Sequence, residues 1–294
     1  MSTVLFDTPG PKARVRHRLY AVLGALVVAA LIAFVIYRFV DTGQFTGRKW
    51  EWLQYSQVQS DLANAILATV KAFALGAVLA IAFGAVFAAG RLSEHAWVRG
   101  ICTFVVEFFR AIPLLILMFL FYYGLPTLGV DTSPLFAVVL GLTLYNGSVL
   151  AEVFRAGILS LPKGQSEAAY ALGMRKTQVM FTVLLPQALR AMLPTIISQL
   201  VVLLKDTALG FLVTYPELLY YARYIGGQGD FGRPIVPSTL VAAAIYIAMC
   251  LLLTALATYL ERRNRRSKKH IDTDAKEAVE MTTAATGGLR GGPF

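Results

Sequence analysis

The sequence predicts an all-α fold: a polytopic bundle of membrane-spanning helices. Of its 294 residues, 57% are hydrophobic and only 15% are charged, and the mean hydropathy is +0.63. A soluble globular chain usually has about 45–50% apolar and about 25% charged residues. The apolar residues are also gathered in blocks, several of which reach the roughly 20 residues needed to cross a bilayer. These observations together predict an integral membrane protein.

The first three expected helices lie in the N-terminal half. The first covers about Leu19–Val40 and the second about Leu62–Gly90, both of them long apolar runs with a single charge. The third is expected at about Ile101–Tyr123. Pro113 is an alternative start for this helix, because proline interrupts a helix, and it would leave Arg99–Arg110 at the membrane interface.

The last three expected helices are Pro134–Leu159, Ala191–Tyr215 and Ser238–Leu260. Beyond them, residues 261–294 begin with a basic run and continue into a polar, Gly-rich and Thr-rich tail that we expect to be disordered.

Basic residues alternate between the two ends of the expected helices. One face would carry the C-terminal run "RRNRRSKK" and ten further cations: Lys12, Arg14, Arg16, Arg18, Arg91, Arg99, Lys163, Arg175, Lys176 and Arg190. The other face would carry only Arg48, Lys49, Arg223 and Arg233. Because cytoplasmic loops are enriched in Lys and Arg, both termini are expected in the cytoplasm. The net charge of +10 is explained by these flanks, so nucleic acid is not an expected partner.

The sequence contains no pattern for nucleotide hydrolysis or for metal binding. A phosphate-binding loop needs Gly-x-x-x-x-Gly-Lys-Ser/Thr, and no such string occurs. Gly227–Gly232 fits Gly-x-Gly-x-x-Gly, but it lies in an expected outer loop and not between a strand and a helix. Cys102 and Cys250 are in or beside apolar segments and are expected to act as small hydrophobic residues. No catalytic or metal site is expected in this chain.

The loop between the fourth and fifth expected helices is long and polar. Ser166 is expected to cap a short helix that has Glu167 in its first turn, where a carboxylate suits the helix dipole. Gly173 allows either a close approach or a bend. A second short helix is expected to follow and to end at Leu185-Pro186. Two short helices make a compact knob on the cytoplasmic face, which would suit the docking of another protein.

This loop resembles the EAA loop of ABC importer permeases. The match consists of Glu167-Ala168-Ala169, Gly173, Val183 and Leu185-Pro186, with the departure that the family has Ile where Val183 stands. The resemblance implies that an ATPase binds six residues of this loop: Glu167, Ala168, Ala169, Leu172, Gly173 and Arg175. Import, as opposed to export, is inferred from this loop alone.

Three further strings are similar to the polar amino acid permeases, the His/Glu/Gln/Arg/opine group. They are "EFFRAIPLL" (107–115), "AEVFRAGILSLPKGQSEAA" (151–169) and "LKDTAL" (204–209). The opening "VLFDTPGPKAR" resembles permeases of actinobacterial glutamate systems. The resemblance implies a type I ABC importer permease fold with a five-helix core, residues 62–260, whose coupling loop lies at about 160–190. Residues 1–18 would then be a basic cytoplasmic segment, and residues 19–61 an added helix with an outer loop.

The resemblance also implies the partners. They would be separate ABC ATPase subunits that carry the ATP and Mg, a second permease subunit that is identical or homologous, an extracytoplasmic amino-acid-binding protein, and the lipids of a bacterial plasma membrane. No cofactor is expected in this chain. An ATP-independent secondary transporter is the alternative, but that class predicts inverted repeats, and the sequence shows none.

Ionisable groups inside expected spans mark candidate substrate contacts, because they are costly in a bilayer. The ionisable candidates are Glu152, Lys205 and Asp206, and the neutral polar residues Asn146 and Thr207 are further candidates. Asp206 suits an α-ammonium group, and Lys205 could serve the second carboxylate of glutamate; a structural ion pair at a subunit interface is the alternative. Adjacent helical residues point about 100° apart, so Lys205 and Asp206 cannot face one spot on a regular helix. Glu152 with Arg155, and Glu107 with Arg110, are spaced i,i+3 and can form local ion pairs.

Overall fold

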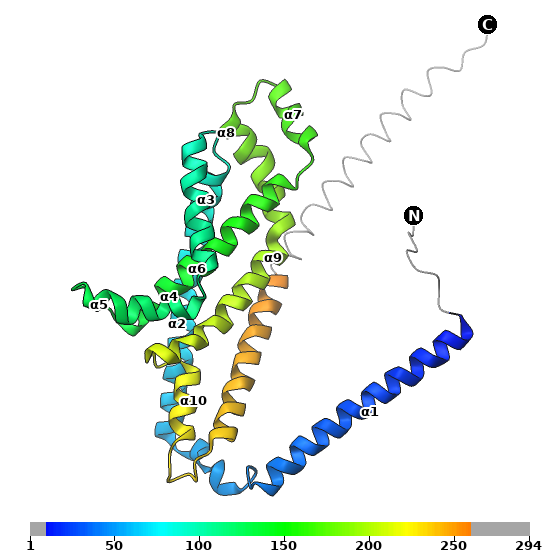
Figure 1. Cartoon of the computed structure of the whole chain (residues 1–294), viewed down its shortest axis with the longest axis vertical. Coiled ribbons are helices and arrows are strands. Elements are labelled where there is room, and N and C mark those ends of the chain that lie inside the picture. The colour runs from blue at the N-terminus through cyan, green and yellow to red at the C-terminus, as the bar shows by residue number, and fades with distance from the viewer. Residues whose placement is uncertain (1–9, 260–294) are drawn as a thin grey trace, which may run out of the picture. The chain divides into compact units, whose positions relative to one another are not determined.

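The computed structural model describes residues 10–259, and within this range it is helical, with turns and loops but no strand (Figure 1). The described residues form two compact units. The smaller unit contains the residues up to Gln59 together with Arg223–Leu240, and the larger contains Ser60–Ala222 and the residues from Val241 onward. The expected basic run and disordered tail at 261–294 lie outside the described residues.

The smaller unit begins with α1, Pro11–Asp41, which is longer at its start than the expected helix. None of its side chains is buried, so this apolar helix is available to lipid along its length. Two short 3-10 turns follow, η1 (Gly47–Lys49) and η2 (Glu51–Gln54). Trp52 of η2 is only 2% exposed, and its Nε1 donates a hydrogen bond to the Lys49 carbonyl at 3.0 Å. This buried tryptophan gives the connection a small core of its own.

Five helices are long and apolar enough to cross a membrane, and a bent pair makes a sixth span if it is counted as one. The five are α1, α2 (Ser56–Arg91), α6 (Pro134–Leu159), the run Lys176–Val213 and the last helix, Ile235–Tyr259. The bounds of α6 agree with the prediction. Its N-cap Ser133 accepts a hydrogen bond from the Phe136 N–H at 3.2 Å, which fixes the start that Pro134 favours.

The prediction of one straight third helix was wrong, and the alternative at Pro113 describes the structure better. The segment is α3 (Ala96–Ala111) followed by Leu114–Thr127, and the two parts are bent by 96°. The second part contains α4, a π-helical turn η3 and the short α5 (Leu114–Phe119, Leu120–Gly124 and Leu125–Thr127). Pro113 lacks an N–H, and the residue before it adopts an extended conformation, so the helix is interrupted there.

The loop after α6 also departs from the prediction. Its first helix, α7, runs over Lys163–Ala171, so Ser166 lies inside it and is not the N-cap. The Ser166 hydroxyl donates to the Lys163 carbonyl at 2.8 Å. Gly173 ends this helix with a φ of +77°, and a Cβ there would meet nothing within 4 Å. Of the two roles open to Gly173, the structure therefore shows the bend.

The expected second short helix is not a separate element. The short α8 (Lys176–Gln178), a π-helical turn η4 (Val179–Leu184), α9 (Leu185–Asp206) and a 3-10 segment η5 (Thr207–Val213) form one continuous run. Pro186 does not close the loop, because the wider turn at η4 accommodates the missing N–H of a proline. The fifth span is consequently longer than Ala191–Tyr215 and is joined directly to the loop.

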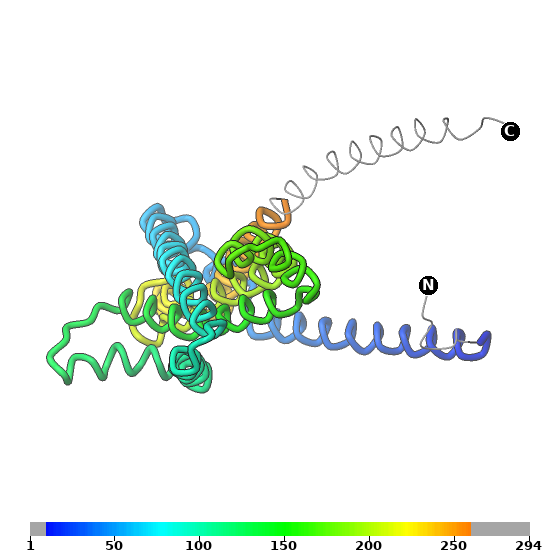
Figure 2. The backbone as a smooth tube through the Cα atoms, turned by 90° about the horizontal axis from the view of Figure 1, so that it is seen from above, coloured from blue at the N-terminus to red at the C-terminus, as the bar shows by residue number. Residues whose placement is uncertain are grey.

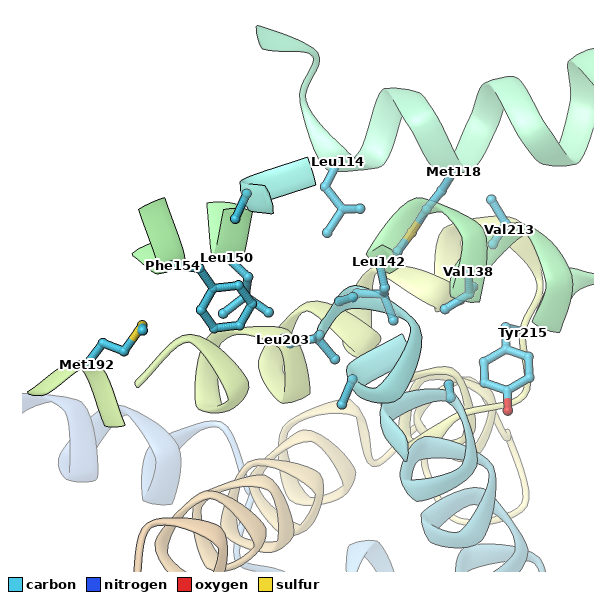
Figure 3. Close-up of a cluster of buried hydrophobic side chains, with 14 of the residues drawn as sticks. Leu114, Met118, Val138, Leu142, Leu150, Phe154, Met192, Leu203, Val213 and Tyr215 are labelled. Carbon is cyan, nitrogen blue, oxygen red and sulfur yellow. The ribbon is translucent and has the colours of Figure 1, made fainter. Parts of the chain in front are cut away.

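The core of the larger unit lies where α6 packs against α9, with α4 and η5 covering one end (Figures 2 and 3). Figure 3 shows side chains from these helices pointing toward one another, among them Met118, Leu142, Leu150 and Leu203. All four are fully buried or nearly so. Since lipid is as apolar as these residues, tight packing and not water exclusion stabilises this core.

Gly84 lies at a close approach of α2 and α6. A Cβ at this position would lie 2.9 Å from Leu150 Cβ, 3.0 Å from the Gly147 carbonyl oxygen and 3.1 Å from the Ala151 nitrogen. Two of these neighbours are backbone atoms, so the helices would have to separate. We expect Gly84→Val to destabilise the fold by about 1–3 kcal/mol or more, seen as lower yield of monodisperse protein and a lower Tm in detergent. Gly100→Val on α3, where a Cβ meets nothing within 4 Å, is the control, and equal stability of the two variants would contradict this packing.

Candidate functional site

A polar cluster joins α6 and α9 inside the larger unit. Asn146 is completely buried on α6. Its Nδ2 donates a hydrogen bond to Asp206 Oδ2 at 3.2 Å, and Gln199 Nε2 donates to Asn146 Oδ1 at 2.7 Å. Gln199 and Asp206 are seven residues apart, close to two helical turns, so they lie on the same face of α9. The sequence prediction named Asn146 and Asp206 but missed Gln199, whose signal was this spacing.

The cluster leaves hydrogen-bonding capacity on Asp206. Its side chain is partly buried, and Oδ1 receives no hydrogen bond from the part of the chain that the structure describes. A carboxylate has about four acceptor positions, so this oxygen can receive further donors. The arrangement is a hydrogen-bonded acid within a span, with one oxygen available to a cationic group.

Lys205 lies elsewhere. It is exposed, and within residues 10–259 it forms no ion pair with Asp206 or with another acid. It lines a cavity of about 490 Å³ whose other walls come from η5 and the last helix: Ala208, Ala243, Tyr246, Ile247, Cys250 and Leu251. The structure therefore separates Lys205 from Asp206, as the 100° step along a helix requires.

Thr207 is buried, and its hydroxyl donates to the Leu204 carbonyl at 2.6 Å. This bond occupies the hydroxyl donor at the point where α9 changes into the tighter η5. A threonine that bonds the backbone in this way commonly alters the helix locally. Thr207 therefore shapes the backbone beside Asp206.

Glu152 belongs to a different cluster. Its oxygens accept hydrogen bonds from Arg155 at 2.5 and 3.1 Å, and Arg91 Nη1 lies 3.0 Å from Oε2. Arg91 is also 3.3 Å from Glu107, and Arg110 lies 3.2 Å from the same carboxylate. Both i,i+3 pairs predicted from the sequence are present, and Arg91 joins them. The five side chains tie the ends of α2, α3 and α6 together.

The α7–α8 loop, residues 163–178, presents an exposed surface. Glu167 and Ala168 are exposed, and Leu172 is 82% exposed at the end of α7. Ala169, by contrast, is 5% exposed, so it packs against the chain itself. A leucine this exposed at the tip of a loop outside the spans favours contact with another protein.

Two contacts hold this loop in place. The Arg175 N–H donates to Gln178 Oε1 at 2.8 Å, which caps α8. Lys176 Nζ lies 2.6 Å from Glu94 Oε1 in the turn between α2 and α3. The hydrogen bond from Lys176 and its positive charge lower the pKa of the Glu94 carboxyl. The loop is thereby connected to α2 and α3 as well as to α6 and α9.

Glu217 is a second residue that the sequence reasoning missed. It is completely buried and accepts hydrogen bonds from the N–H groups of Leu219 and Tyr220, each at 2.7 Å, and from the Tyr246 hydroxyl at 2.6 Å. It stands immediately before α10, Leu218–Gly226, where a carboxylate satisfies free N–H groups. An acid directly before an apolar helical run was the available signal.

The Gly-x-Gly-x-x-Gly string lies in the turn between α10 and the last helix. A dinucleotide site needs this string between a strand and a helix. The geometry here is that of an ordinary loop with Gly232 at a φ of +66°.

Comparison with protein families identifies one match over most of the chain. Residues 80–266 match the model of the binding-protein-dependent transport system inner membrane component. The glutamate transport system permease protein GluD of Corynebacterium glutamicum is 41% identical over 245 residues, which cover 81% of this chain and 89% of GluD. The glutamate/aspartate import permease protein GltK of Escherichia coli O6:H1 is 31% identical, and the match covers 73% of this chain and 98% of GltK.

Solved structures show the same fold. A chain in the crystal structure of an amino acid ABC transporter with histidines has a TM-score of 0.65 and 28% identity, and the match covers 72% of this chain and 98% of that one. A chain of the inward-facing MetNI methionine ABC transporter has a TM-score of 0.58 at 20% identity, and the match covers 71% of this chain and 98% of that one. At this identity the likeness supports the fold alone. The chain is a multi-pass membrane protein with the type I ABC importer permease fold, and it belongs to the family of binding-protein-dependent transport system inner membrane components, among the polar amino acid ABC permeases.

Proposed function

We propose that this chain is the permease subunit of an ATP-driven importer of a polar amino acid, with glutamate as its cargo. The observation that carries this proposal is the exposed α7–α8 loop with its EAA-type sequence, on a chain of this family. The 41% identity with a glutamate system permease supports the cargo. Separate ATPase subunits hydrolyse ATP with Mg. A binding protein delivers the amino acid, and an identical or homologous permease completes the pathway in the plasma membrane, with both termini in the cytoplasm.

The ATPase contacts the exposed part of the α7–α8 loop. Glu167, Ala168 and Leu172 form the contact surface, and Arg175 is exposed on the following turn. Gly173 supplies the bend, and Ala169 supports the loop from within, since it is buried. Because the run from Lys176 continues without a break to Val213, movement of the loop is transmitted along α9 to Asp206.

The polar residues of the spans receive the amino acid. Asp206, oriented by Asn146 and indirectly by Gln199, binds the α-ammonium group through its free oxygen. Lys205, which has no acidic partner among the described residues, binds a carboxylate. Thr207 holds the backbone where α9 changes into η5, directly after Lys205 and Asp206. Glu152, which lies in the arginine cluster, also belongs to the proposed substrate path.

Replacement of Lys205 tests the acidic cargo. The wild-type complex in proteoliposomes is first assayed with labelled glutamate, glutamine, arginine and histidine. We expect glutamate uptake to dominate and Lys205→Gln to reduce it about tenfold or more, since hydrogen bonds to charged groups contribute about 1.5–3 kcal/mol. Lys71→Gln, another exposed lysine in a span, is the matched control. Dominant uptake of a different amino acid, or equal loss in both variants, would contradict the assignment.

A further inference from the structure

The larger unit contains a second cavity, of about 420 Å³, on the seam between α6 and α9. Ligand sites for small molecules typically measure about 300–1,000 Å³, so the volume suits a free amino acid. Most of the wall is small or apolar, and four lining side chains carry polar groups: Arg110, Glu152, Ser160 and Thr195. The cavity lies along the part of α6 that leads into α7, and its lining begins at Val149, just under one turn beyond Asn146.

The two charged residues of this wall have opposite signs. A guanidinium from Arg110 on α3 and a carboxylate from Glu152 on α6 line the same space. An α-amino acid carries one carboxylate and one ammonium on neighbouring atoms, so it needs such a pair. A ligand with only one charge would engage only one of these two side chains.

Arg110 has hydrogen-bond donors that are not used within the described residues. Its Nη1 donates to both oxygens of Glu107 at 3.2 Å, and in the described residues no acceptor is bonded to its Nε or Nη2. The surrounding cluster has three guanidiniums, from Arg91, Arg110 and Arg155, against the carboxylates of Glu107 and Glu152. One positive charge is therefore in excess, and glutamate, whose net charge is −1, would balance it.

Glu152 can accept the ammonium. Arg155 and Arg91 occupy part of its acceptor capacity, and a carboxylate offers about four positions. The remaining wall has Gly157 opposite Met192, where an added Cβ would lie 3.0 Å from the Met192 sulfur. This glycine keeps the space between α6 and α9 open beside the charged pair.

We propose that this cavity binds a free α-amino acid arriving from the α7 side, and that its occupancy slows further import. The carboxylate binds Arg110 and the ammonium binds Glu152. A ligand wedged against α9 on this seam hinders the movement that α9 transmits from the α7–α8 loop to Asp206 in the proposed transport cycle. The inference thus rests on the proposed function and adds product inhibition at a site distinct from the Asn146–Asp206 cluster.

The test uses proteoliposomes that contain the full complex, with ATP and the ATPase on the inside. They are preloaded with increasing concentrations of unlabelled L-glutamate, and the initial rate of labelled glutamate uptake is compared with each variant's own rate without preloading. We expect Arg110→Gln to raise the half-inhibitory concentration about tenfold or more. Ala156→Phe, an exposed lining residue, is expected to do the same by filling the cavity without changing its charge.

Two comparisons separate the cavity from its surroundings. Arg99→Gln removes a guanidinium from α3 that lies outside both the arginine cluster and the cavity wall, and we expect its half-inhibitory concentration to stay within about threefold of wild type. Preloaded 2-oxoglutarate, which lacks the ammonium, is expected not to inhibit. Equal inhibition by 2-oxoglutarate, unchanged inhibition in Arg110→Gln and Ala156→Phe, or an Arg99→Gln effect as large as theirs would each overturn the proposal.

A second measurement keeps this inference separate from the proposed function. Equilibrium binding of labelled L-glutamate is measured on the purified complex without binding protein and without ATP. Wild type is expected to bind one glutamate more per chain than Ala156→Phe. A complex that imports nothing but shows this difference would overturn the proposed function and retain the cavity. A complex that imports glutamate without this difference would overturn only the cavity.

Discussion

Glu167→Arg is expected to abolish ATP-driven uptake while the protein still inserts in the membrane. Glu167 is exposed on α7, and its side chain forms no hydrogen bond or ion pair with a described residue, so the substitution disturbs no internal side-chain contact. Reversing a charge at a protein interface commonly costs about 2–5 kcal/mol, which corresponds to a loss of affinity of about thirtyfold or more. Co-purification of the ATPase and the rate of uptake should therefore fall together.

Asp131→Arg is the matched control for this result. Asp131 is also an exposed acid, but it lies in the loop between α5 and α6 and not in the α7–α8 loop. It should retain ATPase association. If Glu167→Arg retains the ATPase and imports at the wild-type rate, the loop is not the docking surface.

Asp206→Asn is expected to reduce uptake about tenfold or more and to leave ATPase association intact. The asparagine oxygen can still accept the Asn146 hydrogen bond, so the α6–α9 contact is retained. The substitution removes the negative charge that binds the ammonium, an interaction of about 1.5–3 kcal/mol. Uptake and co-purification from the same preparation give both quantities.

Ser198→Ala is the control on the same helix. The Ser198 hydroxyl donates to the Pro194 carbonyl at 3.0 Å, beside Gln199 but outside the polar cluster. It should leave uptake within about threefold of wild type, the range of a neutral hydrogen bond. Equal uptake by Asp206→Asn and wild type would exclude the carboxylate from the substrate path.

The features that the sequence predicted correctly are those set by local chemistry. The bounds of α6 follow from Pro134 at its first turn and a long apolar run. The i,i+3 pairs Glu107–Arg110 and Glu152–Arg155 follow from helical spacing. The separation of Lys205 from Asp206 follows from the 100° step between neighbours.

The features that were missed depend on tertiary structure or on irregular backbone. Proline predicts a break, and it makes one at Pro113 but not at Pro186, where the π-helical turn η4 absorbs it. Ser166 has the side chain of an N-cap, yet α7 begins earlier, after another proline. Gln199 becomes part of the polar cluster only because α6 brings Asn146 opposite it. The seven-residue spacing of Gln199 and Asp206 indicates a shared face of one helix, but it does not indicate the contact with Asn146.

We propose that this permease imports an amino acid with ATP that a partner chain hydrolyses. The most direct test is the initial rate of labelled glutamate uptake by the reconstituted complex with ATP, with a non-hydrolysable ATP analogue, and with an imposed ion gradient alone. We predict uptake only where ATP can be hydrolysed, and none in the Glu167→Arg complex. Uptake that an ion gradient drives without ATP would contradict the claim and would identify a secondary transporter.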